Sequence, residues 1–225
     1  ILQSRYLAHH GYGVLALDLP GHGRSEGPAL GGVEHLADWI AAVLDAANAK
    51  QASVVGHSMG SLIALECATR HSDRVAKIAL LATAYPMKVS TELLDATKDN
   101  EPLAQEMVNI WSHLAYAQYP NNPGPGFWVI GQSLRLMQRQ KPGVMYADFS
   151  ACNAYGGGAE AAARVRCPAL FLIARRDAMT PARSAQAFAQ TVKGARIVMI
   201  EGSGHNMMGE KPDEVLDALL AFLKQ

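Results

Sequence analysis

The chain has 225 residues, of which 49% are hydrophobic and 18% are charged, a composition sufficient for one well-packed domain. Its 20 Lys and Arg side chains balance 20 Asp and Glu side chains, so the formal net charge is zero. This balance argues against a nucleic acid or an anionic membrane surface as partner, because either would require a basic excess. The longest apolar runs fall short of the roughly 18–20 residues of a membrane span, so no membrane span is expected.

The three cysteines, Cys67, Cys152 and Cys167, are an odd number and lack the spacing of a metal site. We expect free, mostly buried thiols in a reducing compartment, and therefore a cytoplasmic protein. The sequence implies neither a metal nor an organic cofactor.

Strand and helix patterns alternate along most of the chain, which predicts an α/β fold with a mostly parallel central sheet flanked by helices. Residues 1–10 are interpreted as the end of a helix. Further along the chain, strands are expected at residues 12–19, 53–55, 75–82, 169–174 and 195–200. Helices are expected at residues 33–47, 59–70, 181–192 and 212–223.

Residues 85–164 interrupt this alternation. Apolar side chains recur at helical spacing over residues 103–114 and 130–137, and the loop between them, at 119–126, is rich in Pro, Gly and Asn. No strand is predicted in this stretch. We therefore divide the chain into a core of residues 1–84 and 165–225 and a helical cap insertion of residues 85–164, which is expected to lie over one end of the sheet.

Residues 56–60 read Gly-His-Ser-Met-Gly, which matches the G-x-S-x-G pattern of a nucleophile elbow between a strand and a helix. On such a turn the serine adopts a strained backbone conformation, and the small Gly56 and Gly60 are expected to avoid clashes beside it. Ser58 is therefore the candidate nucleophile. The backbone N–H of Met59 would lie at a helix N-terminus, where it stabilises developing negative charge. The alternative is a glycine-rich turn with an incidental serine.

A serine hydroxyl is a poor nucleophile unless a base removes its proton. His205 follows the last predicted strand and precedes the closing helix, which is the expected place for that base. Asp177 follows the strand at 169–174, and its carboxylate would orient His205. Two alternatives stay open for the acid: Asp177 pairs with a neighbouring arginine on the surface, or Asp148 in the insertion takes its role.

With these motifs the chain resembles the α/β-hydrolase superfamily, in particular its small capped serine esterase-like branch. The similarity covers nearly the whole chain and rests on the following segments: residues 18–25 (DLPGHGRS), the elbow at 56–60, Asp177 with Pro181, and Gly204-His205 with residues 210–212 (EKP). The resemblance implies that Ser58, Asp177 and His205 form a catalytic triad.

The resemblance also implies that the insertion lines an acyl or alcohol pocket. The candidate pocket residues are His57, Trp111, Trp128, Met137 and Met207. The alternative for the apolar side chains of the insertion is that they pack helix against helix. In the family, a strand and a His-Gly-type loop precede the helix that ends near residue 10, and that loop supplies a second oxyanion N–H. We therefore expect the second donor upstream of Ile1 and interpret the sequence as lacking its N-terminal strands.

The expected function is that of a serine hydrolase, which cleaves a carboxylic ester or thioester of a small molecule through an acyl-enzyme on Ser58. Activity should fall as acid protonates the imidazole of His205. An alternative reaction is carbon–carbon bond hydrolysis of a diketone-type substrate, for which Arg135 or Arg139 would seat a second carbonyl or carboxylate. An alternative from another class is a ligand-binding protein that keeps the fold without turnover. A homodimer is left open.

Overall fold

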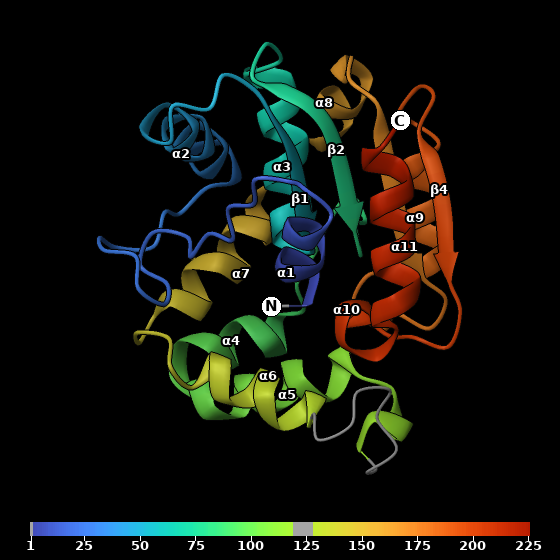
Figure 1. The fold of residues 1–225 in the computed structure, drawn as a ribbon. Coiled ribbons are helices and arrows are strands. Elements are labelled where there is room, and N and C mark those ends of the chain that lie inside the picture. The colour runs from blue at the N-terminus through green and yellow to red at the C-terminus, as the bar shows by residue number, and fades with distance from the viewer. Residues whose placement is uncertain (1, 119–127) are drawn as a thin grey trace.

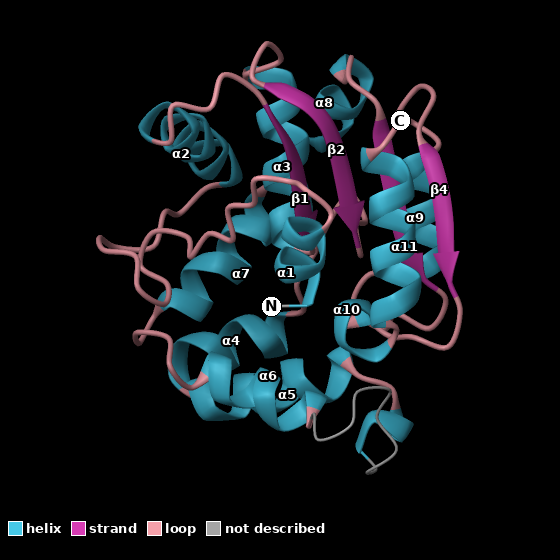
Figure 2. Cartoon of the chain, in the orientation of Figure 1, coloured by secondary structure: helices cyan, strands magenta, loops and turns pink. Residues whose placement is uncertain are grey.

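The computed structural model describes residues 2–118 and 128–225 (Figure 1). Within these residues, four parallel strands form one sheet in the order β1 (Ala52–His57), β2 (Val75–Leu81), β3 (Ala169–Ala174), β4 (Arg196–Ile200). Because all four strands run in the same direction, their carboxyl ends meet at one edge of the sheet (Figure 2). The predicted α/β class, with helices around a parallel sheet, is confirmed.

The helices of the described residues are α1 (Leu2–His9), α2 (Val33–Ala46), α3 (Met59–Arg70), α4 (Thr91–Asp99), α5 (Glu101–Ser112), α6 (Val129–Met137), α7 (Val144–Ala154), α8 (Gly158–Arg164), α9 (Ala182–Ala189), α10 (Met207–Glu210) and α11 (Pro212–Leu223), with a 3-10 turn at Ala115–Gln118. The expected helices at 33–47, 59–70 and 212–223 agree with α2, α3 and α11 to within one residue. The helix expected to end at residue 192 ends earlier, at Ala189.

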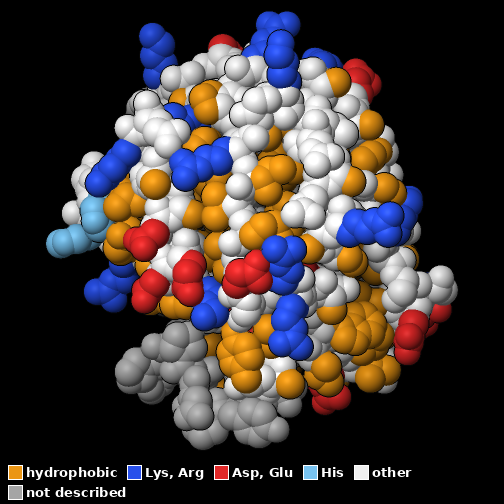
Figure 3. Space-filling view, turned by 90° about the vertical axis from the view of Figure 1, so that its right-hand side faces the viewer, with side chains coloured by type: hydrophobic (Ala, Val, Ile, Leu, Met, Phe, Trp, Pro, Cys, Tyr) orange, Lys and Arg blue, Asp and Glu red, His pale blue; other side chains and the backbone are white. Residues whose placement is uncertain are grey.

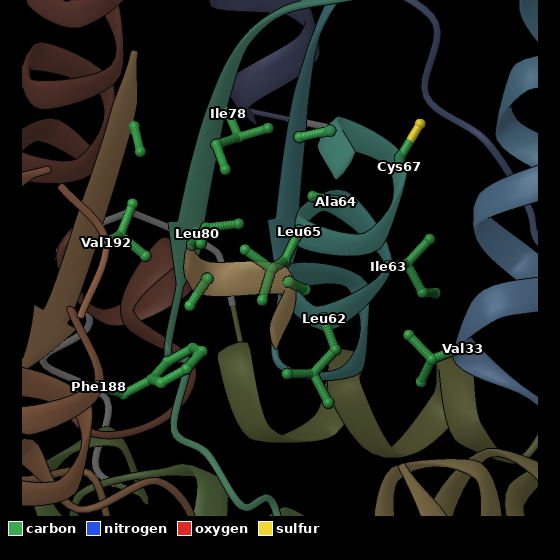
Figure 4. Packing of buried hydrophobic residues seen from close by; sticks show 14 of the residues in the cluster. Val33, Leu62, Ile63, Ala64, Leu65, Cys67, Ile78, Leu80, Phe188 and Val192 are labelled. Atoms are coloured by element: carbon green, nitrogen blue, oxygen red, sulfur yellow. The ribbon is translucent and has the colours of Figure 1, made fainter. Parts of the chain in front are cut away.

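Helices cover both faces of the sheet, so β3 is buried along its whole length. Alternate side chains of the strands point to opposite faces. Ile78 and Leu80 of β2 pack in a cluster with α2, α3, α8 and α9, whereas Leu81 packs on the other face with α11. Figure 4 shows the first cluster, in which Leu62 and Leu65 of α3 lie on the side of the sheet that carries Ile78 and Leu80.

One predicted strand is wrong, because residues 12–19 form no strand. An apolar run becomes a strand only when a neighbouring strand completes its backbone hydrogen bonds, and no described strand pairs with this run. Val14, Leu15 and Leu17 are exposed, with 57% of the Leu15 surface open to solvent. In the described sheet β1 has a neighbour on one side alone, β2, and its Val55 is exposed as well.

Between β2 and β3 the described chain is helical, and α4 to α8 follow one another without a strand. The helical spacings at 103–114 and 130–137 correspond to α5 and α6. Figure 1 shows α4, α5 and α6 beyond the end of the sheet toward which the strand arrows point. The predicted loop at 119–126 lies outside the described residues. That residues 85–164, the insertion, form a separate cap stays a prediction.

On the face shown in Figure 3, Lys and Arg side chains are interspersed with Asp and Glu side chains and with hydrophobic ones. This mixture agrees with the zero net charge of the chain. Among residues 2–118 and 128–225, no helix combines the length and the apolar character that crossing a membrane requires.

The turn between β1 and α3 depends on a close approach of two backbone segments. A Cβ atom at Gly56 would lie 1.9 Å from the carbonyl oxygen of Gly60, far inside any permitted contact. A Cβ atom at Gly60 would meet nothing within 4 Å outside its own helix. The expectation that a small residue avoids a clash is therefore confirmed for Gly56, where the Gly60 backbone leaves no room for a side chain. The same expectation is wrong for Gly60.

Gly56→Ala is expected to lower the free energy of unfolding by about 3 kcal/mol or more, because β1 and α3 must separate to admit the methyl group. The matched variant Gly60→Ala should change it by less than about 1 kcal/mol, because the methyl group enters open space. Urea denaturation of both variants measures the difference. Equal losses of stability would contradict this description of the turn.

Candidate active site

Ser58 lies on the sharp turn between β1 and α3, as the G-x-S-x-G pattern predicts. Its backbone has φ 53° and ψ −120°, a conformation that a non-glycine residue keeps only when the surrounding structure imposes it. The Ser58 N–H donates to the carbonyl oxygen of Leu81 at 2.9 Å, which anchors the turn to the end of β2. Met59 begins α3, so its N–H belongs to the first-turn amides that have no acceptor within the helix.

Asp177 and His205 come from the loops that follow β3 and β4, and their side chains are in contact. His205 Nδ1 lies 2.9 Å from Asp177 Oδ2 and 3.1 Å from Oδ1. Because a carboxylate only accepts hydrogen bonds, Nδ1 carries the proton, and Nε2 is the basic nitrogen of the neutral ring. The two side chains are almost fully buried, with 5% of His205 and 1% of Asp177 exposed. This pairing fixes the tautomer of the imidazole and the position of Nδ1.

The Asp177 carboxylate is held by further hydrogen bonds within its own loop. The N–H groups of Met179 and Thr180 donate to Oδ1, both at 2.8 Å, and Thr180 Oγ1 donates to Oδ2 at 2.7 Å. Burial raises the pKa of Asp177, but the hydrogen bond and charge of His205 and the Thr180 donors outweigh it, so the pKa lies below its usual value. Asp177 is therefore ionised at neutral pH.

Asp148 and Arg175, the residues invoked by the two alternatives for the acid, both contact other residues. Asp148 Oδ2 lies 2.7 Å from His22 Nε2, and this hydrogen bond raises the pKa of His22, against the opposing effect of burial. Arg175, a candidate surface partner of Asp177, instead donates from Nε to Glu201 Oε1 at 3.0 Å. Asp177 is thus the acid that contacts His205.

His57 connects the elbow to the loop that carries His205. Its Nε2 lies 2.8 Å from the backbone carbonyl oxygen of His205, so Nε2 donates this hydrogen bond. The two imidazole rings lie with their centroids 4.7 Å apart. Burial, with a contribution from the charge of His205, lowers the pKa of His57 to about 3, so its ring is neutral. The residue that directly precedes Ser58 therefore lies against His205.

The other predicted pocket residues lie in different environments. Met207 is fully buried in the cluster between the sheet and α11, and Met137 packs with apolar side chains of α4, α5 and α7. Trp111 and Trp128 are exposed. For the two methionines these positions favour helix and core packing, and a pocket role stays a prediction for all of them.

The hydrogen bonds that Glu210 and Asn206 make beside His205 were not predicted. The buried carboxylate of Glu210 accepts the N–H groups of Leu114, at 2.7 Å, and Gly204, at 2.6 Å. Asn206 Nδ2 donates to His113 Nε2 at 2.8 Å. The only signal for Glu210 was its place in the motif at 210–212, because a contact between residues 96 apart in the chain leaves no local pattern.

The described residues contain no cluster of three His, Cys, Asp or Glu side chains that could hold a metal ion. Cys67, Cys152 and Cys167 are free thiols. Burial raises the pKa of Cys67 to about 11 and that of Cys152 to about 12, so both are protonated at neutral pH and lack the reactive thiolate.

The sequence profile of the alpha/beta hydrolase family matches residues 2–218 of the chain. The chain therefore belongs to the α/β hydrolase family, and the resemblance described from its motifs is confirmed.

Three relatives with assigned functions illustrate the range of this family. The dihydrolipoyllysine-residue acetyltransferase component of the acetoin cleaving system from Pseudomonas putida is 29% identical over 94% of this chain and 56% of its own length. The pimeloyl-[acyl-carrier protein] methyl ester esterase of Neisseria meningitidis serogroup A is 28% identical over 85% of this chain and 62% of its own length. The chain thus spans less than two thirds of both. A non-heme chloroperoxidase of Streptomyces lividans is 28% identical over 99% of this chain and 85% of its own length.

Solved structures of esterases share the fold. The esterase EaEST from Exiguobacterium antarcticum superposes with a TM-score of 0.87 at 20% identity, over 100% of this chain and 86% of its own. A thermophilic esterase from Thermogutta terrifontis has a TM-score of 0.79 at 23% identity, over 92% and 77% of the two chains. At these identities the likeness shows the fold and nothing finer.

Asp177→Asn is expected to lower the free energy of unfolding at neutral pH, because an amide NH₂ replaces an oxygen that accepts from Thr180 and His205. The folded-state pKa of Asp177 is depressed, so its stabilisation is complete above the ordinary value of 3.8 and is lost as the pH falls through the folded-state value. The stability difference from the wild type should therefore shrink in acid.

Urea denaturation near neutral pH and at about pH 3 measures this difference. Asp217→Asn, on the exposed side of α11, is the matched control and should show little difference at either pH. A stability difference for Asp177→Asn that is as large at about pH 3 as at neutral pH would contradict the assignment of a depressed pKa.

Proposed function

We propose that the protein is a serine hydrolase that cleaves a carboxylic ester or thioester, with Ser58 as nucleophile, His205 as general base and Asp177 as the residue that orients His205. The observation that carries this proposal is the buried hydrogen bond from His205 Nδ1 to Asp177, which leaves Nε2 as the basic nitrogen. The ring bearing that nitrogen lies against His57, the neighbour of Ser58 on the elbow.

In the proposed reaction, His205 Nε2 removes the proton of Ser58 Oγ as Oγ attacks the carbonyl carbon of the substrate. The Met59 N–H stabilises the oxyanion that forms on the carbonyl oxygen. The imidazolium then gives its proton to the leaving alcohol or thiol, and an acyl-enzyme remains. Water, deprotonated by His205, attacks this acyl group. The imidazolium then returns the proton to Ser58 Oγ as the carboxylic acid leaves, which restores both residues. The ionised Asp177 stabilises the imidazolium in both halves of the reaction.

An ester substrate is favoured by one of the relatives. That relative is named as a methyl ester esterase. The helices α4 to α6 lie beyond the carboxyl ends of the strands, on the side where ligands bind in open α/β sheets. We therefore assign residues 85–164 as the cap over the site, with a small ester-like molecule as its ligand.

No observation on the described residues favours carbon–carbon bond hydrolysis over ester hydrolysis. That alternative invoked Arg135 or Arg139 to seat a second carbonyl or carboxylate. Arg135 Nη1 donates to Gln138 Oε1 at 2.9 Å on the exposed side of α6, and Arg139 is exposed too. A non-catalytic ligand-binding protein would have no need for an imidazole held at Nδ1 by a buried carboxylate.

Turnover of p-nitrophenyl esters and acyl thioesters by the purified protein tests the proposal. Ser58→Ala should abolish turnover, because it removes the hydroxyl that forms the acyl-enzyme. Asp177→Asn should lower kcat by about 10²–10⁴-fold, because the amide favours the wrong imidazole tautomer. Asp148→Asn is the matched control and should retain kcat, since Asp148 contacts His22. Full activity in Ser58→Ala, or equal losses in the two Asp variants, would overturn the assignment.

The pH dependence of kcat/KM tests the role of His205 separately. On the acid side of the profile, kcat/KM should fall, because the imidazolium cannot accept the Ser58 proton. Protonation of a single group gives a fall of about tenfold per pH unit. His57 should not contribute above about pH 4, because its pKa lies at about 3. A rate that stays constant down to about pH 4 would contradict a histidine base.

A further inference from the structure

Glu210 carries a buried carboxylate that the proposed acyl transfer does not use. It ends α10 and has 1% of its surface exposed. Its Oε1 accepts the N–H of Leu114 at 2.7 Å, and its Oε2 accepts the N–H of Gly204 at 2.6 Å. Burial raises the pKa of Glu210 above its usual value, although these two donors act in the opposite direction. A buried carboxylate is unfavourable unless polar partners hold it, and here each oxygen has one.

The two donors belong to segments that meet beside the proposed base. Gly204 directly precedes His205, and Leu114 follows the end of α5 in the insertion. On the other side of His205, the N–H of Asn206 donates to the carbonyl oxygen of Ser112 at 2.8 Å. Asn206 is therefore hydrogen-bonded directly to the end of α5. Gly204 is connected to Leu114, just beyond that end, through the Glu210 carboxylate.

We propose that Glu210 is a positioning residue for His205, which ties the peptide ahead of His205 to the insertion and so directs Nε2 toward Ser58. This inference rests on the proposed function. The hydrogen bond to Asp177 fixes one nitrogen of the ring but leaves the ring free to pivot about that contact. A second anchor, on the backbone, is needed to define where Nε2 points.

The chemistry of the side chain explains why the anchor is a carboxylate. Two backbone N–H groups point at one side chain, so it must offer two acceptor atoms. Glutamine has the same shape but only one acceptor oxygen, and its NH₂ group would face one of the donors. Aspartate keeps both acceptors, but it is one methylene shorter and cannot keep both hydrogen bonds at their present lengths.

Glu210→Gln tests the proposal, with Glu214→Gln as the matched control. Glu214 is exposed and pairs with Lys211 across 3.4 Å, so the control makes the same charge change at the surface. With p-nitrophenyl butyrate, Glu210→Gln should lower kcat by about 10- to 100-fold while KM changes little, because the base is misdirected rather than the substrate displaced. Glu214→Gln should retain kcat.

A proton NMR resonance gives a readout that a purely structural role would not move. The Nδ1 proton of His205, hydrogen-bonded to Asp177, should resonate far downfield in the wild type. In folded Glu210→Gln it should shift or broaden, because the ring no longer keeps one geometry against the carboxylate. An unchanged resonance together with an unchanged kcat per folded molecule would overturn the proposal, as would a kcat loss that only matches the unfolded fraction.

Glu210→Asp provides the decision if the glutamine variant fails to fold. Because the aspartate keeps the charge and both acceptors but cannot keep both hydrogen bonds at their present lengths, kcat should fall below that of the wild type, and full wild-type kcat would overturn the proposal. Failure of the proposed function is recognised separately, as wild-type turnover that Ser58→Ala does not abolish. In that event the NMR resonance alone decides, and an unchanged resonance in either Glu210 variant contradicts the positioning role.

Discussion

A parallel sheet ends all of its strands at the same edge, and the candidate site depends on this constraint. Ser58 follows β1, Asp177 follows β3 and His205 follows β4, so residues far apart in sequence reach one edge through the direction of the strands. The strands hold that direction because apolar side chains on both faces are packed under helices. At the edge itself, the turn at Gly56 holds Ser58 in a conformation that an ordinary loop would not keep.

Hydrogen bonds between the loops then hold His205 in one position and orientation. Asp177 holds one ring nitrogen of His205, His57 donates to its carbonyl oxygen, and Glu210 holds the preceding peptide. Asp177 and His57 differ in charge for a physical reason. Asp177 is ionised and stabilises a proton on the imidazole, whereas His57 is neutral and adds no positive charge beside it.

The sequence predicted those features that have a local pattern. The GHSMG motif predicted the elbow at Ser58, and apolar periodicity predicted α2 to within one residue. The run at residues 12–19 has the composition of a strand, but forming a strand depends on a neighbour, which no local pattern reports. The same limit applies to Glu210 and His57, whose partners are distant in sequence and become neighbours only in the folded chain.

Labelling with a fluorophosphonate, followed by intact mass measurement and peptide mapping, tests the central claim most directly. The reagent reacts with a serine only when its hydroxyl is activated and an oxyanion site receives the phosphonyl oxygen. The account predicts one adduct per chain, located on Ser58 and absent from Ser58→Ala. An adduct on another residue, or no adduct on the folded wild-type protein, would contradict the claim that Ser58, His205 and Asp177 act together.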